Sequence, residues 1–229
     1  MTEELKYFSL AHQLNKKHKM LLDSSKVHFR ASLNSLSLIS VSEEKPELGT
    51  KCSFTKYYSA DNPQALIKTD VQKINSKSIP QRPTPEKHLQ AWIINHALKN
   101  NNELPFDKNI KFISSEIAVK NNDGKKIVTD ILGYNETDNQ LCVIELKYDR
   151  QEKRLIEQVN NFEKVIKEKT EFFLQLLSIH GFKSNKQVPL SILKLVVWPH
   201  EKTSPKIKLK TEYIVEITYH PDYSFQKFN

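Results

Sequence analysis

The stretch IVTDILGYNETDNQLCVIELKY, residues 127–148, has the pattern of two apolar strands joined by a polar turn. It places Asp130 in the first strand and Glu145 and Lys147 in the second. Burying a charged group costs free energy unless the group is paired or binds a metal ion. We therefore expect these three side chains to be kept in this segment for their chemistry.

Side chains alternate along a strand, so Glu145 and Lys147 share one face, and the hairpin brings Asp130 onto that face in the right register. Two carboxylates that both stay ionised at close range need a cation between them. Mg²⁺ fits because it takes oxygen ligands and keeps several waters. One of those waters can attack a phosphodiester while Lys147 orients or deprotonates it. The alternative is a hairpin whose charged side chains lie on a solvated face.

The composition indicates a folded protein with one sizeable core, or a core with an appendage. The chain has 229 residues, of which 38% are hydrophobic and 27% charged. No apolar run approaches the roughly 20 residues that span a bilayer. The N-terminus carries acids where a signal peptide carries bases, and the two cysteines form neither a disulfide framework nor a zinc pattern. We expect a cytoplasmic protein that does not enter a membrane.

The charge is unevenly distributed. The net charge is +8: residues 1–85 contribute 13 − 8 = +5, residues 86–150 contribute 9 − 10 = −1 and residues 151–229 contribute 13 − 9 = +4. Basic flanks suit a polyanion such as nucleic acid, and an acidic centre suits a divalent cation. A lysine-rich surface that only confers solubility is the alternative.

Three lysines near the C-terminus form a candidate phosphate-binding row. Lys206, Lys208 and Lys210 alternate with Ile207 and Leu209, so a strand would place the three ammonium groups on one face. Such a row can face the phosphates of DNA. It can also be a solvated edge strand whose lysines prevent aggregation.

The order of elements predicts a mixed α/β core that follows an N-terminal extension. Prolines and weak periodicity predict a linker over residues 60–83, which divides the chain into an extension, 1–83, and a core domain, 84–229. The extension is expected to contain a helix in 1–22, a strand or a pair of strands in 27–41, and a strand in 51–59. The core is expected to contain a helix that begins at Thr84 and Pro85, a strand over 111–119, the hairpin, a helix over 151–179, and strands over 190–198 and 206–220.

Other polar residues are candidates for the same site. Glu86 lies in the first turn of the helix before the hairpin, and Gln158 interrupts the apolar stripe of the helix that follows. Alternatively, Glu86 is an acid favoured by the helix dipole, and Gln158 is a polar residue at a sheet edge. Glu116, in the strand before the hairpin, is a competing carboxylate ligand.

These motifs together resemble the PD-(D/E)xK nuclease superfamily. Asp130 in VTDILGY and the pair Glu145 and Lys147 in VIELKY match the signature, with Thr129 where the superfamily name has Pro. The further segments EKHLQAW, ISSEIAV and IEQVNNF make residues 84–165 similar to the nuclease domain of NucS-type mismatch endonucleases. Residues 1–80 show no such similarity, so mismatch specificity does not carry over.

The resemblance implies a restriction-endonuclease-like mixed sheet flanked by helices and a Mg²⁺-dependent endonuclease acting on DNA, with Mn²⁺ as an alternative metal. It implies that Asp130, Glu145 and Glu86 bind the metal, that Lys147 serves the attacking water, and that Gln158 positions Lys147 or the phosphate. Homodimers are common among such enzymes, which leaves a homodimer among the expected assemblies. The competing functions are a non-catalytic nucleic-acid-binding module and a protein-interaction module on the same fold.

Overall fold

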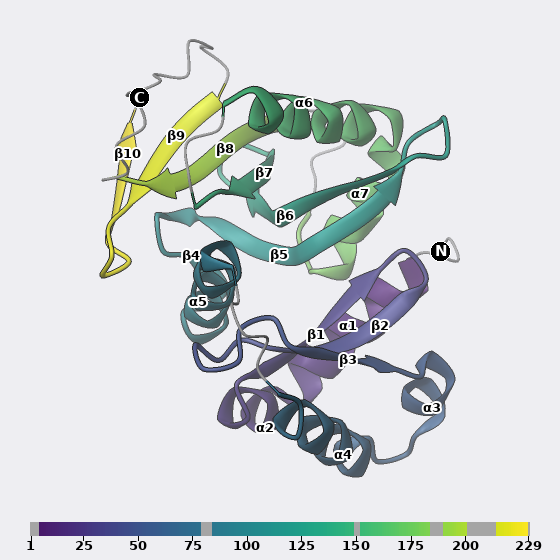
Figure 1. The fold of residues 1–229 in the computed structure, drawn as a ribbon. Coiled ribbons are helices and arrows are strands. Elements are labelled where there is room, and N and C mark those ends of the chain that lie inside the picture. The colour runs from purple at the N-terminus through teal and green to yellow at the C-terminus, as the bar shows by residue number, and fades with distance from the viewer. Residues whose placement is uncertain (1–4, 79–83, 149–151, 184–189, 201–213, 229) are drawn as a thin grey trace.

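The computed structural model describes residues 5–78, 84–148, 152–183, 190–200 and 214–228. These residues form a seven-stranded mixed sheet with helices on its faces and, before it in the chain, a smaller unit built on a three-stranded sheet (Figure 1). The expected mixed α/β class is therefore confirmed. Within the described part of the chain, no helix is both long enough and apolar enough to cross a bilayer.

The seven-stranded sheet has the order β10-β9-β8-β7-β6-β5-β4. Strands β4 to β7 pair antiparallel, β7, β8 and β9 pair parallel, and β10 is antiparallel to β9. Their bounds are β4 Glu103–Leu104, β5 Asp107–Lys120, β6 Lys126–Asn135, β7 Gln140–Leu146, β8 Ser191–Pro199, β9 Ile214–Tyr219 and β10 Phe225–Phe228. The chain passes from β7 to the parallel strand β8 through helices, as parallel neighbours require.

Helices cover both faces of this sheet. Helix α5 (Pro85–Lys99) packs on one face, where its Leu89 and Ile93 join a core with Ile131 and Ile144. Helices α6 (Glu152–Glu168) and α7 (Thr170–Ile179) pack on the other face, in a core that continues into the N-terminal unit. Figure 1 shows α6 and α5 on opposite sides of the sheet.

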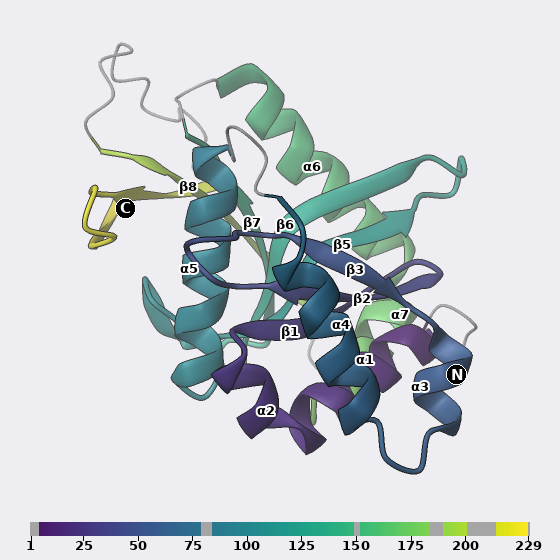
Figure 2. The ribbon, with the colours of Figure 1, turned by 60° about the horizontal axis from the view of Figure 1, so that its bottom comes forward.

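The N-terminal unit contains three strands and four helices. Strands β1 (Val27–Ser32), β2 (Ser35–Ser40) and β3 (Gly49–Cys52) form an antiparallel sheet. Helices α1 (Leu5–Lys17), α2 (Lys19–Ser24) and α4 (Gln64–Asn75) lie around it, and α3 (Phe54–Ser59) follows β3 (Figure 2). Of the two alternatives expected over residues 27–41, one strand or a pair, the structure has the pair.

Two expectations for this unit are wrong. The expected strand over residues 51–59 ends at Cys52, because Ser53 accepts a hydrogen bond from the Lys56 backbone N–H and begins α3. The expected linker over residues 60–83 contains α4, which buries Ile67 and Ile74. Two apolar anchors one heptad apart are enough for a helix that packs on a sheet, although they leave little periodic signal in the sequence.

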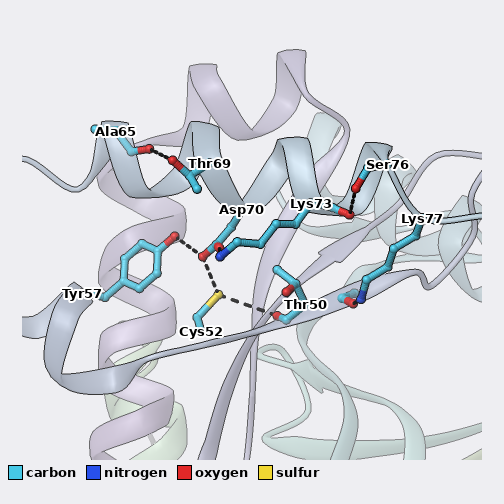
Figure 3. A network of polar contacts seen from close by, with 10 residues as sticks. Thr50, Cys52, Tyr57, Ala65, Thr69, Asp70, Lys73, Ser76 and Lys77 are labelled. Atoms are coloured by element: carbon cyan, nitrogen blue, oxygen red, sulfur yellow. Dashed lines mark hydrogen bonds and ion pairs between the residues drawn. The ribbon is translucent and has the colours of Figure 1, made fainter.

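A buried carboxylate ties α4 to the rest of this unit (Figure 3). Asp70 Oδ2 accepts hydrogen bonds from the Tyr57 hydroxyl at 2.9 Å and from Cys52 Sγ at 3.4 Å, while Oδ1 accepts one from Lys73 Nζ at 2.7 Å. Burial, together with the nearby Asp70 charge, raises the pKa of the Cys52 thiol to about 12. The thiol therefore stays protonated and remains a donor to Asp70.

The core elements follow the expected order with three differences. Helix α5 begins at Pro85 as expected, although the side chain of Thr84 at its N-cap makes no capping hydrogen bond. The helix expected over residues 151–179 is divided at Lys169 into α6 and α7, and the expected apolar stripe is buried on both. Strand β9 covers the end of the strand expected over residues 206–220, and neither β4 nor β10 was expected.

Candidate active site

The hairpin register brings two carboxylates together. Strands β6 and β7 pair antiparallel with Ile131 opposite Ile144. The regular pairing ends there, and the next residues, Asp130 and Glu145, lie close enough for their carboxyl groups to interact. The two carboxyl groups share a hydrogen bond. The hairpin therefore places Asp130 and Glu145 on one face, as the alternation of the strands predicts.

Backbone and side-chain hydrogen bonds fix Asp130. Its Oδ2 accepts a hydrogen bond from the Leu146 backbone N–H at 2.8 Å, and its carbonyl oxygen accepts one from Gln90 Nε2 at 2.8 Å. Gln90 is buried on α5, one turn after Glu86, and links this helix to β6. Sequence reasoning missed Gln90, although a buried amide on the apolar face of a helix is a signal that it could have used.

Glu145 is the less satisfied member of the pair. The residue is 1% exposed, and its Oε1 has no hydrogen-bond partner among the described residues. Lys147 Nζ lies 3.7 Å from Glu145 Oε2 and donates a hydrogen bond to the Leu146 carbonyl oxygen at 3.0 Å. A buried polar oxygen without a partner is rare in native proteins and calls for a ligand, an ion or a water.

Burial dominates the electrostatics of this pair. It raises the pKa of Glu145 well above the usual value, with a further rise from the charge of Asp130 and an opposing effect from Lys147. Burial also raises the pKa of Asp130, while Lys147 and the Leu146 N–H oppose that rise. The shared hydrogen bond raises the pKa of Glu145 and lowers that of Asp130. Burial thus disfavours ionisation of both carboxyl groups together, and a bound cation would offset that cost.

The other expected site residues lie apart from this pair. Glu86 is half-buried, and its Oε1 accepts a hydrogen bond from the Tyr148 backbone N–H at 3.4 Å, just beyond the end of β7. Gln158 is exposed on α6, so the expectation that it lies on the buried face of that helix is wrong. The buried face runs through Leu155, Val159 and Phe162, and position 158 falls outside it. Lys206, Lys208 and Lys210 lie outside the described residues.

A two-carboxylate metal site fits the pair. Within residues that the structure describes, no group of three or more His, Cys, Asp or Glu side chains is arranged to hold a metal ion. Mg²⁺ is often bound through one or two carboxylates while it keeps several waters. The unpartnered Oε1 of Glu145 supplies a free donor of the right chemistry, and Asp130 supplies the second carboxylate. Asp130 and Glu145 are thus the residues that would hold Mg²⁺.

Comparison of the chain with protein-family models and with the sequences of curated proteins gives no match. The interpretation of the site therefore depends on its own geometry.

Proposed function

We propose that this protein is a divalent-metal-dependent nuclease whose reaction takes place at Asp130, Glu145 and Lys147. The observation that carries the proposal is the pair of carboxyl groups, Glu145 buried and Asp130 partly buried, with one Glu145 oxygen unpartnered among the described residues and an ammonium group 3.7 Å away. A bound Mg²⁺ would activate a water molecule and offset the negative charge that develops on a phosphodiester.

The topology around the pair supports a restriction-endonuclease-like core. Helix α5 is followed by the antiparallel strands β5, β6 and β7, then by α6 and α7, and then by β8 parallel to β7. The PD-(D/E)xK resemblance implies this order, with the acidic residues on the second and third of the three strands. Asp130 on β6 and Glu145 on β7 are at those positions.

Each side chain has a role that follows from its surroundings. Asp130 is held by Leu146 N–H, so its carboxylate is oriented before a cation arrives. Lys147 places a positive charge beside the pair, where it orients the attacking water and stabilises charge on the phosphate. Glu86 fixes the backbone at Tyr148 at the edge of the site. Gln158 is exposed and suits contact with a substrate phosphate.

The proposed substrate is DNA. Residues 1–85 and 151–229 are basic, with net charges of +5 and +4, and they flank the acidic centre that carries the site. A carboxylate pair repels DNA before metal binds, so attraction must come from lysines elsewhere in the chain. The row at Lys206, Lys208 and Lys210 is the sequence feature best suited to this role.

One observation favours a second candidate function. The described residues provide two clustered carboxylates but no third ligand, and a module that only binds nucleic acid needs no metal site. A non-catalytic nucleic-acid-binding module therefore remains the competing proposal. It predicts DNA binding without cleavage in the presence of Mg²⁺ or Mn²⁺.

Incubation with linear, circular, single-stranded and branched DNA, with Mg²⁺ or with EDTA, tests both proposals. The nuclease should cut at least one substrate with Mg²⁺ and none with EDTA, and Asp130→Asn should lower the rate by about 10² or more. Glu136→Gln is the matched control, because Glu136 is an exposed acid in the turn of the same hairpin. It should cut at the wild-type rate. Binding without cleavage would establish the second candidate, and neither activity would refute both.

A further inference from the structure

A third acid lies on the strand next to the carboxylate pair. On β5, Ser115 is opposite Ile131 and Ile117 is opposite Thr129. Glu116 lies between them and Asp130 lies between their partners, so the two acids occupy neighbouring positions on β5 and β6. The charge of Glu116 also acts on Asp130 and contributes to its raised pKa. With Glu145 on β7, three neighbouring strands carry one acid each, which together form a row across the sheet.

In this structure, two ion pairs hold the carboxylate of Glu116 away from Asp130 and Glu145. Its Oε2 lies 3.1 Å from Arg30 Nη2, and its Oε1 lies 3.8 Å from Lys87 Nζ. Its side chain is 34% exposed, in contrast to the 2% of the Glu145 side chain. A side chain with this exposure has room to change rotamer, and neighbouring strands lie about 5 Å apart, which a Glu side chain can span without movement of the strands.

The ion pair that holds Glu116 comes from the N-terminal unit. Arg30 lies on β1, and its Nη1 is 2.5 Å from Glu47 Oε2. The Glu47 side chain is 1% exposed, and that of Arg30 is 15% exposed. Arg30 is thus fixed by Glu47 and extends its second nitrogen to Glu116 on the larger sheet. The contact joins the two units of the molecule next to the candidate active site.

The backbone at Glu116 is strained. Its φ is 44° although it lies within β5, and this region of φ is uncommon for residues other than glycine. Such conformations persist where surrounding contacts hold them. The ion pair with Arg30 is one contact that Glu116 makes in this conformation.

We infer that Glu116 is a third ligand of the cation site and that Arg30 holds it away from that site until a divalent cation competes for its carboxylate. The inference depends on the proposed function, because it assumes that Asp130 and Glu145 bind a cation. It goes beyond that function by giving the N-terminal unit a role, which is to set the cation affinity of the site. The unpartnered buried oxygen of Glu145 is the independent sign that a ligand belongs in this row.

Titration of Mn²⁺, followed by calorimetry and by the electron paramagnetic resonance signal of the free ion, tests the inference on the full chain. Glu116→Gln should weaken Mn²⁺ binding about tenfold, and Arg30→Gln should strengthen it several-fold. In the Glu116→Gln background, Arg30→Gln should have no effect, because the carboxylate that Arg30 restrains is gone. Glu47→Gln is the matched control: it removes a carboxylate from the same arginine but not from the row, so Mn²⁺ binding should not weaken.

The outcomes separate this inference from the proposed function. If Mn²⁺ binding depends on Asp130 but Glu116→Gln leaves it unchanged, Glu116 is not a ligand and only the inference fails. If Arg30→Gln strengthens binding equally with and without Glu116, Arg30 acts through its charge alone and the inference also fails. If Asp130→Asn leaves Mn²⁺ binding unchanged, the cation site itself is wrong and both fail. Thermal unfolding of each variant checks that the fold is retained.

Discussion

Two buried carboxylates, each beside a lysine, have different surroundings in the two units of this molecule. Asp70, which is 6% exposed, accepts hydrogen bonds from Tyr57, Cys52 and Lys73 (Figure 3). Glu145, which is 1% exposed, faces a second carboxyl group and has an oxygen without a partner among the described residues. A buried charge that is fully hydrogen-bonded can be part of the fold, whereas one that is left unsatisfied is costly.

The difference indicates what each carboxylate is for. Asp70 joins α3, α4 and β3, and its hydrogen bonds account for both of its oxygens. Glu145 lies near the end of β7, three residues before the exposed Tyr148. The comparison indicates a structural role for Asp70 and supports the proposed role of Glu145 in cation binding. Three predictions test this difference.

The largest effect is expected on the rate of DNA cleavage when Lys147, beside Glu145, is replaced, and Lys73, beside Asp70, provides the control. Lys147→Met keeps the length of the side chain and removes its charge, so the rate of DNA cleavage should fall by roughly 10² or more while DNA affinity changes little. Lys73→Met makes the same change beside Asp70 and should leave the rate unchanged. Single-turnover cleavage and fluorescence anisotropy measure the two quantities. A Lys147→Met variant that cuts at the wild-type rate would remove Lys147 from the mechanism.

The next effect concerns stability at Asp70. Asp70→Ala removes the acceptor of the buried Tyr57 hydroxyl and of Cys52, and an unsatisfied buried donor costs about 1–3 kcal/mol. We expect the free energy of unfolding to fall by about 2–3 kcal/mol in urea denaturation. Asp61→Ala removes an exposed acid from the same unit and should change it by less than about 0.5 kcal/mol. Equal effects of the two substitutions would show that the network does not stabilise the fold.

The sequence could predict the part of the site that depends on local pattern. Alternation in the hairpin predicts that Asp130 and Glu145 share a face, because register within a hairpin follows from the strands themselves. It could not predict the contact of Arg30 with Glu116, which joins two sheets far apart in the chain. The sequence also suggested that Gln158 lies on the buried face of its helix, whereas it is exposed. A polar residue at the edge of an apolar stripe can lie just inside or just outside the buried face.

Dependence on tertiary contacts also explains why α4 was predicted as a linker. Prolines lie on both sides of this helix, and its buried face includes Asp70, a residue type that usually lies at the surface. Its burial depends on donors from α3 and β3, which only the tertiary structure brings together. In contrast, α5 begins with Thr84 and Pro85, a local signal that is independent of tertiary contacts.

The smallest effect concerns the pH dependence of stability at Glu145. Burial raises the pKa of Glu145 in the folded protein above its ordinary value of 4.5. The stability linked to this group is therefore fully present below pH 4.5 and is lost as the pH rises through the folded-state pKa. Glu145→Gln removes the titrating group. At pH 7 and in EDTA it should raise the free energy of unfolding, because the folded wild-type protein must then either ionise this buried carboxyl group or keep it protonated above its ordinary pKa.

This gain should disappear well below pH 4.5, where the wild-type carboxyl is protonated in both the folded and the unfolded state. Excess Mg²⁺ at pH 7 should reverse its sign, because a cation that binds only the folded wild-type protein stabilises it and the Glu145→Gln substitution would weaken that binding. Urea denaturation at the two pH values, with EDTA or Mg²⁺, measures all three quantities. If Glu145→Gln destabilises the protein at pH 7 in EDTA, Glu145 has a structural role like that of Asp70.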